Sequence, residues 1–290
     1  MPIGQTDLIL SPDGRIYHLQ LTPEQVAQTI ITVGDPDRVT DVSKHFDSIE
    51  HRVQHREFVT HTGMLRGRRV SVVSTGIGTD NVDIVINELD ALHNIDFATR
   101  EIKPKLTALD VIRIGTTGGL QTNMTAGTFI VSSIAVGLDN LMHFYDFEEN
   151  VREFSLSSAL ADYAEARNED LLWMPYSAVA SDALLSLFPT DEFKRGITLT
   201  APGFYAPQGR KIRARPLEPK MLQILQQFTS DKNKITNIEM ETAGIYGLCR
   251  LLGHRAVSCS VVLANRTDDT FSTDPAADVE RLIVAVLARL

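Results

Sequence analysis

The chain has 290 residues, a formal net charge of −9 and an apolar share of 43%. This length can bury a large core, and we expect one domain spanning residues 1–290. The acidic balance argues against nucleic-acid binding, which needs accumulated Lys and Arg. No apolar stretch is long enough to cross a bilayer, and the N-terminus lacks the pattern of a secretory signal. The two cysteines, Cys249 and Cys259, have apolar neighbours, which favours buried thiols in the cytoplasm over a disulfide framework.

The first part of the chain predicts strands and helices in alternation. Residues 30–34 are a short apolar run followed by Asp35-Pro36-Asp37-Arg38, which predicts a strand, a turn and a helix. Between residues 51 and 74, two β-rich runs flank a turn at 66–68 and predict a hairpin. Residues 79–92 carry apolar side chains at three- and four-residue spacing, the period of a helix that packs one face on a core.

The rest of the chain continues the alternation. We expect strands at 111–114, 128–133 and 177–180, and helices at 151–166, 221–228 and 274–290. Residues 100–109 are expected to form a surface loop. Strands that alternate with helices, with a hairpin inserted early, predict an α/β sandwich around a mixed sheet.

Two glycine-containing segments are candidate anion sites. Gly34 follows a predicted strand and Arg38 comes four residues later, so that backbone amides and a guanidinium can converge on a small anion. Arg113 lies in an apolar run before a glycine- and hydroxyl-rich turn at 115–119. A buried arginine costs desolvation free energy unless it meets an anion. Each segment also fits an ordinary glycine turn with a solvated arginine.

Two further segments suit a sugar and a base. The sequence Glu-Met-Glu at 239–241 lies where a strand is expected to enter a helix. Carboxylates accept hydrogen bonds from sugar hydroxyls and methionine packs under a ring, although acids at a helix start also favour the helix dipole. In the segment 204–210, the amide of Gln208 matches the donor and acceptor edge of a pyrimidine, and Arg210 can hold its carbonyl oxygen. On its own this segment would be interpreted as a surface loop.

The histidines do not predict a metal site. His51, His55 and His61 are close in sequence, but the segment is expected to be a strand, which separates His51 from His55 by about 13 Å at about 3.3 Å per residue. One zinc ion cannot bridge that distance. The chain also has no glycine fingerprint for a dinucleotide and no nucleophile elbow, so metal, dinucleotide and serine-hydrolase chemistry are disfavoured.

Taken in order, these four segments resemble the uridine phosphorylase branch of the nucleoside phosphorylase family, from about Tyr17 to the C-terminus. Tyr17-His18-Leu19-Gln20-Leu21-Thr22, His55-Arg56-Glu57-Phe58 and Ser74-Thr75-Gly76-Ile77-Gly78 also look like family segments. The resemblance implies a single-domain three-layer sandwich and reversible phosphorolysis of uridine to uracil and ribose 1-phosphate. It also implies a homodimer, or a hexamer built as a trimer of dimers, with residues 1–28 contributing to a subunit interface.

The resemblance assigns roles to particular residues. It implies phosphate binding by Gly34, Arg38, Arg113 and Thr116, with Arg56 supplied by a neighbouring subunit. It implies ribose contacts from Glu239, Met240 and Glu241, with His18 of the neighbour near the 5′-hydroxyl. It implies base contacts from Phe204, Gln208, Arg210 and Arg266. Inorganic phosphate is then a co-substrate, no cofactor is expected, and a structural K⁺ ion near Glu57 and Ser74 is an added expectation from the family.

Glycosidic bond cleavage leaves positive character on the ribose and negative charge on the departing base. We expect phosphate, held by Arg38, Arg56 and Arg113, to be both the nucleophile and an anion beside the developing cation. We expect Gln208 and Arg210 to stabilise the leaving base.

Some residues leave alternatives open. Residues 241–247 look closer to the purine enzymes of the family, and 100–109 looks like an insertion relative to short bacterial members. Asn265 lies where related purine enzymes carry an acid that protonates the base. A purine phosphorylase of broad specificity, a water-using nucleosidase and a non-catalytic binding protein are therefore alternatives, and the choice among uridine, thymidine and deoxyuridine is open.

Overall fold

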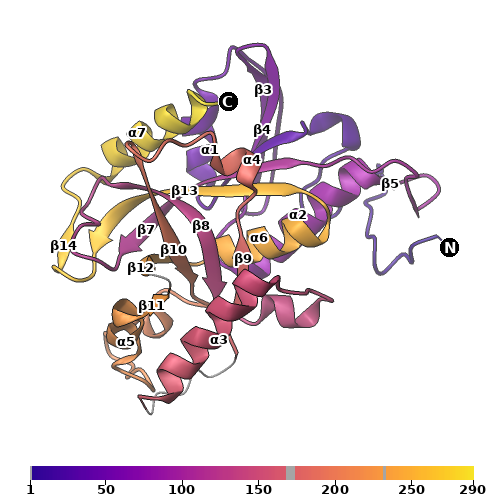
Figure 1. The fold of residues 1–290 in the computed structure, drawn as a ribbon. Coiled ribbons are helices and arrows are strands. Elements are labelled where there is room, and N and C mark those ends of the chain that lie inside the picture. The colour runs from indigo at the N-terminus through magenta and orange to yellow at the C-terminus, as the bar shows by residue number, and fades with distance from the viewer. Residues whose placement is uncertain (1, 168–173, 231–232) are drawn as a thin grey trace. The chain divides into compact units, whose positions relative to one another are not determined.

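The computed structural model describes residues 2–167, 174–230 and 233–290 (Figure 1). The chain divides into two compact units. One holds the residues up to Ile112 together with Leu248–Arg255, and the other holds Arg113–Gly247 with Ala256–Leu290. Both units mix helices and strands, which confirms the predicted α/β class. That residues 1–290 fold as one domain stays a prediction.

The first unit is built on four strands. They are β1 (Thr29–Val33), β2 (Ser48–His55), β3 (Phe58–Leu65) and β4 (Arg68–Ser74). β1 runs parallel to β4, and β4, β3 and β2 form an antiparallel meander. The unit also contains η1 (Pro23–Gln25), α1 (Pro36–Ser43), α2 (Thr79–Asn94), β5 (Ile95–Asp96) and β6 (Glu101–Ile102).

Local chemistry explains where these elements begin and end. The Asp35 side chain caps α1 by accepting a hydrogen bond from the Asp37 amide, and Pro36 takes the first helical position. The predicted turn between β3 and β4 places both Arg66 and Gly67 at positive φ, 49° and 79°, which matches the right-handed twist of a hairpin.

Two predictions for this unit were incomplete. The region from 51 to 74 holds parts of three strands rather than the predicted two. β2 was not recognised as a separate strand because its side chains alternate between exposed and half-exposed and give it no apolar face. The expected surface loop at 100–109 begins with β6, which pairs with β5. The Arg100 guanidinium donates to the carbonyl oxygens of Ile3, Gly4 and Leu8 and so holds the N-terminal segment on its own unit.

The second unit contains most of a mixed sheet. Its strands are β7 (Asp110–Gly119, from Arg113 onward), β8 (Phe129–Gly137), β9 (Tyr176–Val179), β10 (Phe193–Thr200), β11 (Thr229–Ser230), β12 (Asn233–Glu239), β13 (Arg255–Asn265) and β14 (Thr270–Phe271). β8, β10 and β12 run parallel, whereas β9 and β13 join β8 in antiparallel orientation. The register places Thr200 beside both Gly137 and Glu239, so the carboxyl ends of the three parallel strands meet.

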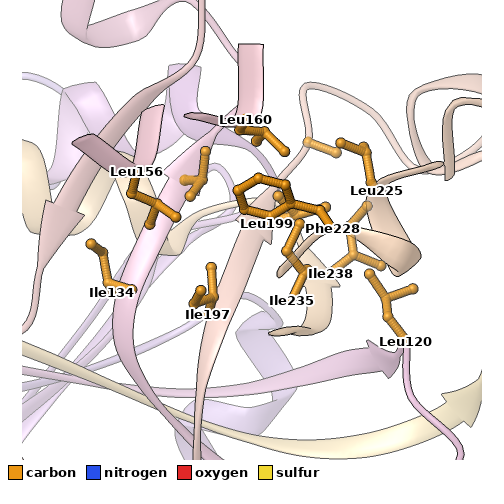
Figure 2. Close-up of a cluster of buried hydrophobic side chains, with 12 residues drawn as sticks. Leu120, Ile134, Leu156, Leu160, Ile197, Leu199, Leu225, Phe228, Ile235 and Ile238 are labelled. Carbon is orange, nitrogen blue, oxygen red and sulfur yellow. The ribbon is translucent and has the colours of Figure 1, made fainter. Parts of the chain in front are cut away.

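The helices of the second unit are η2 (Leu141–Phe144), α3 (Val151–Glu165), α4 (Asp182–Leu185), η3 (Ala206–Gln208), α5 (Met221–Gln227), α6 (Thr242–Leu251, as far as Gly247 in this unit) and α7 (Pro275–Leu287). An apolar cluster lies between the sheet and the helices α3 and α5. Figure 1 shows α3 beside β9 and α5 beside β11 and β12. Leu156 and Leu160 of α3 meet Ile197 and Leu199 of β10, with Phe228 beside them (Figure 2). The helices predicted at 151–166, 221–228 and the C-terminus are confirmed.

One prediction for this unit was wrong. Residues 115–119 are the second half of β7 rather than a turn, and Gly118 and Gly119 pair with Ile238 and Asn237 of β12. The glycines make room for neighbours, since a Cβ at Gly119 would lie 2.4 Å from the Met124 carbonyl oxygen. Among the described residues, no helix is both long and apolar enough to span a membrane.

Candidate active site

A buried arginine between two carboxylates forms the centre of the site in the second unit. Arg113, on β7, is 5% exposed. Its Nη2 lies 2.5 Å from Oε2 of Glu241 and 3.2 Å from Oε2 of Glu239, and its Nη1 donates to the Ser260 hydroxyl at 3.1 Å. The structure therefore joins the residue predicted to bind phosphate directly to both carboxylates predicted to bind ribose.

Neighbouring groups fix the orientation of Glu239. Its carboxylate accepts hydrogen bonds from the Thr200 hydroxyl at 2.7 Å and from the backbone amides of Glu241 and Thr242. The Thr200 hydroxyl in turn accepts from the Ala243 amide at the start of α6. Thr200 and Ser260 are functional candidates that the sequence analysis missed, because an isolated hydroxyl residue on an apolar strand carries no distinguishing pattern.

Glycine is required beside the arginine. Arg113 and Gly115 are two positions apart on β7 and so face the same side of the sheet. A Cβ at Gly115 would lie 1.9 Å from Nη1 of Arg113, far inside any acceptable contact. The glycine that suggested a turn in the sequence instead provides the space in which the guanidinium lies.

Burial and charge oppose each other in this cluster. Burial raises the pKa of Glu239, and the charge of Arg113 partly offsets that rise while Glu241 adds to it. Burial alone would lower the pKa of Arg113, but the charges of Glu239 and Glu241 outweigh it, so the pKa lies above its ordinary value. Arg113 is thus held in its charged form, and the negative charge on Glu239 is costly unless hydrogen-bond donors surround it.

The segment 204–210 forms a second polar cluster in the same unit. Gln208 is 2% exposed, and its Oε1 accepts a hydrogen bond of 2.6 Å from Nη1 of Arg210. Nη1 of Arg266 donates to the backbone carbonyl oxygen of Gln208 at 3.2 Å. The guanidinium of Arg210 stacks on the Phe204 ring, with Cζ 3.7 Å from the ring centroid. The structure therefore brings together all four residues predicted to contact the base.

Two nearby arginines in this cluster affect each other's charge. Burial, and then repulsion by Arg266, lower the pKa of Arg210 to about 10. Burial also lowers the pKa of Arg266. Two neighbouring guanidinium groups repel each other, which costs free energy. An electron-rich group such as a carbonyl oxygen beside them is therefore bound favourably.

The remaining predicted residues of the second unit, Met240 and Thr116, are half-buried. Met240 lies between the two glutamates, and Thr116 lies on β7 next to Gly115. Neither position contradicts the predicted contacts with ribose and phosphate, which stay predictions.

In the first unit, the residues expected to serve a neighbouring subunit lie together. Nδ1 of His18 lies 2.6 Å from Oε1 of Glu88, and the same carboxylate accepts from the His18 and Leu19 amides. Arg56 is exposed in the turn between β2 and β3 at a φ of 54°, and its Cζ lies 5.5 Å from the Tyr17 ring centroid. Tyr17 also contacts the His18 ring edge-on.

The other predicted residues of the first unit lie at or near the ends of its strands. Gly34 directly follows β1, and Arg38 is half-buried in the first turn of α1. The Ser74 hydroxyl donates to the Glu57 carbonyl oxygen at 2.6 Å and accepts from the Val59 amide at 2.7 Å. Ser74 thus fixes the β2–β3 turn, and the suggested K⁺ site at Glu57 and Ser74 stays a prediction.

Comparison with known proteins identifies the family. The model of the Phosphorylase superfamily matches residues 28–290, so the chain belongs to this superfamily. This confirms the resemblance inferred from the motifs.

Individual relatives match over most of their length. A uridine phosphorylase from Thermococcus kodakarensis is 30% identical over 277 residues, which cover 94% of this chain and 85% of that protein. A uridine phosphorylase from Haemophilus influenzae is 29% identical, with 87% of each chain covered. The crystal structure of a Trypanosoma brucei nucleoside phosphorylase, described as showing uridine phosphorylase activity, matches with a TM-score of 0.86 at 27% identity and covers 98% of each chain.

Proposed function

We propose that this chain catalyses the reversible phosphorolysis of uridine, transferring its ribosyl group to inorganic phosphate and releasing uracil. The observation that carries the proposal is the buried side-chain amide of Gln208, whose oxygen accepts from Arg210, while Arg266 donates to the backbone carbonyl of the same residue. An imide presents a carbonyl, an N–H and a second carbonyl in a row, which an amide and a guanidinium can pair with together. The activity named for the relatives from Thermococcus kodakarensis and Trypanosoma brucei supports the same substrate.

The proposal assigns the same roles that the motifs suggested. Phosphate is bound by Gly34, Arg38, Arg113 and Thr116, with Arg56 from a neighbouring subunit. Ribose is bound by Glu239, Met240 and Glu241, with the neighbour's His18 at the 5′-hydroxyl. The base is bound by Phe204, Gln208, Arg210 and Arg266.

The contacts of Arg113 suggest how the site couples phosphate to ribose. Arg113 already touches Glu239 and Glu241, so one guanidinium can share its donors between a phosphate oxygen and the carboxylates that accept from ribose hydroxyls. The Thr200 hydroxyl, two backbone amides and Arg113 hold Glu239 in a fixed orientation, in which it can also accept from ribose hydroxyls. The carboxylates would in this way fix the sugar beside the nucleophile.

Catalysis then follows from the charges that develop. As the glycosidic bond breaks, the ribose becomes cationic, and the proposal assigns its stabilisation to the phosphate and the two carboxylates. Negative charge moves onto the uracil carbonyl oxygens, where Gln208 and Arg210 are proposed to stabilise it. Phosphate attacks the anomeric carbon, and uracil leaves with the bonding electron pair.

The wider proposal is that the enzyme works in the cytoplasm as a homo-oligomer, without a resident cofactor. The clustering of Tyr17, His18 and Arg56 supports a surface that completes a neighbour's pocket. A structural K⁺ ion near Glu57 and Ser74 belongs to the same proposal.

The purine alternative is disfavoured by Asn265. Its amide nitrogen donates to the Gln121 and Met124 carbonyl oxygens, and its oxygen accepts from the Thr267 and Asp268 amides. The residue at this position is thus a fully bonded structural amide, and an amide is far too weak an acid to protonate a purine base. The purine-like segment 241–247 also has a packing role, since a Cβ at Gly247 would lie 2.7 Å from Sδ of Met142.

A substrate panel tests this proposal. With phosphate in excess, kcat/KM for uridine should exceed that for inosine and adenosine by at least about a hundredfold, because a purine cannot pair with both Gln208 and Arg210. Faster cleavage of inosine or adenosine would contradict the base assignment.

A further inference from the structure

A cavity in the second unit lies apart from the candidate active site. Its volume is about 830 Å³, which falls within the range of about 300–1,000 Å³ typical of small-molecule sites. Its walls come from β8, the early part of β10 and β12, the first turns of α3 and the segment that follows β7. Thr200 and Glu239 end β10 and β12, so the cavity lies toward the opposite end of these parallel strands. None of the candidate site residues lines it.

The charged side chains that line the cavity are all basic. Among the described residues they are Arg152 from α3, Arg195 from β10 and Lys234 from β12, and no Asp or Glu accompanies them. Arg195 makes one backbone contact, from Nη2 to the Leu185 carbonyl oxygen at 3.3 Å. All three side chains are exposed, so each can reach an anion placed in the cavity and donate to it. This local charge is opposite to the net charge of −9.

The position of Arg152 adds to this argument. It is the second residue of α3, a helix of 15 residues whose first turn is capped by Asn150 and Glu153. A positive side chain is unfavourable at a helix N-terminus, where the dipole already concentrates positive charge. Arg152 therefore weakens the helix slightly while it strengthens the attraction of the cavity for an anion.

The floor of the cavity is apolar. Ile134, Leu156 and Ile197 line it, and they form one edge of the buried cluster drawn in Figure 2. A ligand that carries charge on one side and a flat apolar group on the other would use both surfaces. Guanidinium groups match phosphate oxygens in a bidentate manner.

We propose that this cavity is a second binding site, distinct from the candidate active site, for an organic phosphate of nucleotide size. The phosphate lies among Arg152, Arg195 and Lys234, and the organic part covers Ile134, Leu156 and Ile197. The size of the cavity and the mixture of cationic wall and apolar floor carry this assignment.

Calorimetric titration tests the proposal with AMP, adenosine and inorganic pyrophosphate as probes. AMP should bind more tightly than pyrophosphate, which cannot use the apolar floor, and adenosine should bind at least tenfold more weakly than AMP. Arg152→Glu and Lys234→Glu should each lower AMP affinity at least tenfold. Arg68→Glu makes the same charge change at an exposed position of β4 and should leave the affinity within about twofold.

The titration also separates this cavity from the active site. Arg113→Ala should leave AMP binding unchanged, and Arg152→Glu should leave uridine cleavage unchanged, with thermal melting used to show that each variant is folded. Loss of AMP binding in Arg113→Ala with retention in Arg152→Glu and Lys234→Glu would overturn the proposal. Absence of AMP binding to the unaltered protein, or equal binding of adenosine or of pyrophosphate, would overturn it as well.

Discussion

At the scale of single residues, Gly115 gives the sharpest test of the Arg113 site. A Cβ at this position would lie 1.9 Å from Nη1 of Arg113. Gly115→Ala should therefore displace the guanidinium and lower kcat/KM for uridine by roughly two orders of magnitude. Ser260→Ala is the matched control, because it removes one neutral contact of Arg113 and leaves both ion pairs in place. If Gly115→Ala kept the activity of the unaltered protein, the exact placement of Arg113 would not matter to catalysis.

A second residue-scale prediction concerns the base. Cytosine has an amino group where uracil has a carbonyl and lacks the imide N–H, so it cannot pair with both Gln208 and Arg210. Each unmatched buried polar group costs about 1–3 kcal/mol. Cytidine should therefore be cleaved roughly two to four orders of magnitude more slowly than uridine.

A variant of Gln208 tests whether this residue discriminates between uridine and cytidine. Gln208→Ala should weaken uridine binding far more than ribose 1-phosphate binding, because the proposed sugar contacts lie at 239–241. Steady-state kinetics in both reaction directions separate the two effects. A variant in which the two KM values rose together would place Gln208 outside the base site.

At the scale of elements, Asn265 at the end of β13 is relevant to whether the enzyme cleaves pyrimidine or purine nucleosides. Asn265 is 1% exposed, and its amide nitrogen donates to two carbonyl oxygens. Asn265→Asp would replace that donor with an oxygen that repels both carbonyls, and we expect a loss of about 2 kcal/mol or more in the free energy of unfolding. Asn140→Asp, at an exposed position, should change stability by less than about 0.5 kcal/mol.

The same variant tests activity. Asn265→Asp should gain no measurable cleavage of inosine or adenosine, because the new carboxyl would lie among backbone groups rather than at a base. Efficient purine cleavage by Asn265→Asp at unchanged stability would revive the purine alternative.

Elements with a strong local pattern were predictable, and elements without one were not. The helix at 79–92 was predicted from its three- and four-residue apolar spacing, and the structure contains it as α2. β10 was not predicted, because Lys194, Arg195 and Gly196 interrupt its apolar residues. β13 was not predicted either, since a buried strand shows no alternation between polar and apolar residues.

The site was predictable as a set of residue types but not as a set of contacts. An arginine inside an apolar strand and two acids before a helix were each recognisable. The bond between Arg113 and Glu241 joins residues 128 positions apart, and no local pattern contains such a pairing. The glycines after Arg113 suggested a turn. In the structure they are needed because Arg113 and Met124 pack against them, and such tertiary contacts cannot be recognised in the sequence.

At the scale of the whole molecule, the proposal that a neighbouring subunit supplies His18 and Arg56 predicts that active sites are completed between subunits. Arg56→Ala and Arg113→Ala should each be nearly inactive alone. After mixing and subunit exchange, a pocket that takes Arg113 from one chain and Arg56 from the other is intact, and random pairing restores about a quarter of the pockets.

The control for this experiment pairs Arg38→Ala with Arg113→Ala. Both residues are proposed to serve the same pocket from the same chain, so no mixed oligomer should regain activity. Equal recovery in the two mixtures, or no recovery after proven exchange of Arg56→Ala with Arg113→Ala, would contradict the proposed sharing of Arg56.

A requirement for inorganic phosphate distinguishes phosphorolysis of uridine from its hydrolysis. The measurement follows uracil, ribose 1-phosphate and free ribose during incubation of the protein with uridine, with and without inorganic phosphate. Because Arg38, Arg56 and Arg113 are assigned to the nucleophile, uracil and ribose 1-phosphate should appear in equal amounts, and only when phosphate is present. Release of uracil together with free ribose at the same rate in phosphate-free buffer would show that water is the nucleophile and would contradict the account.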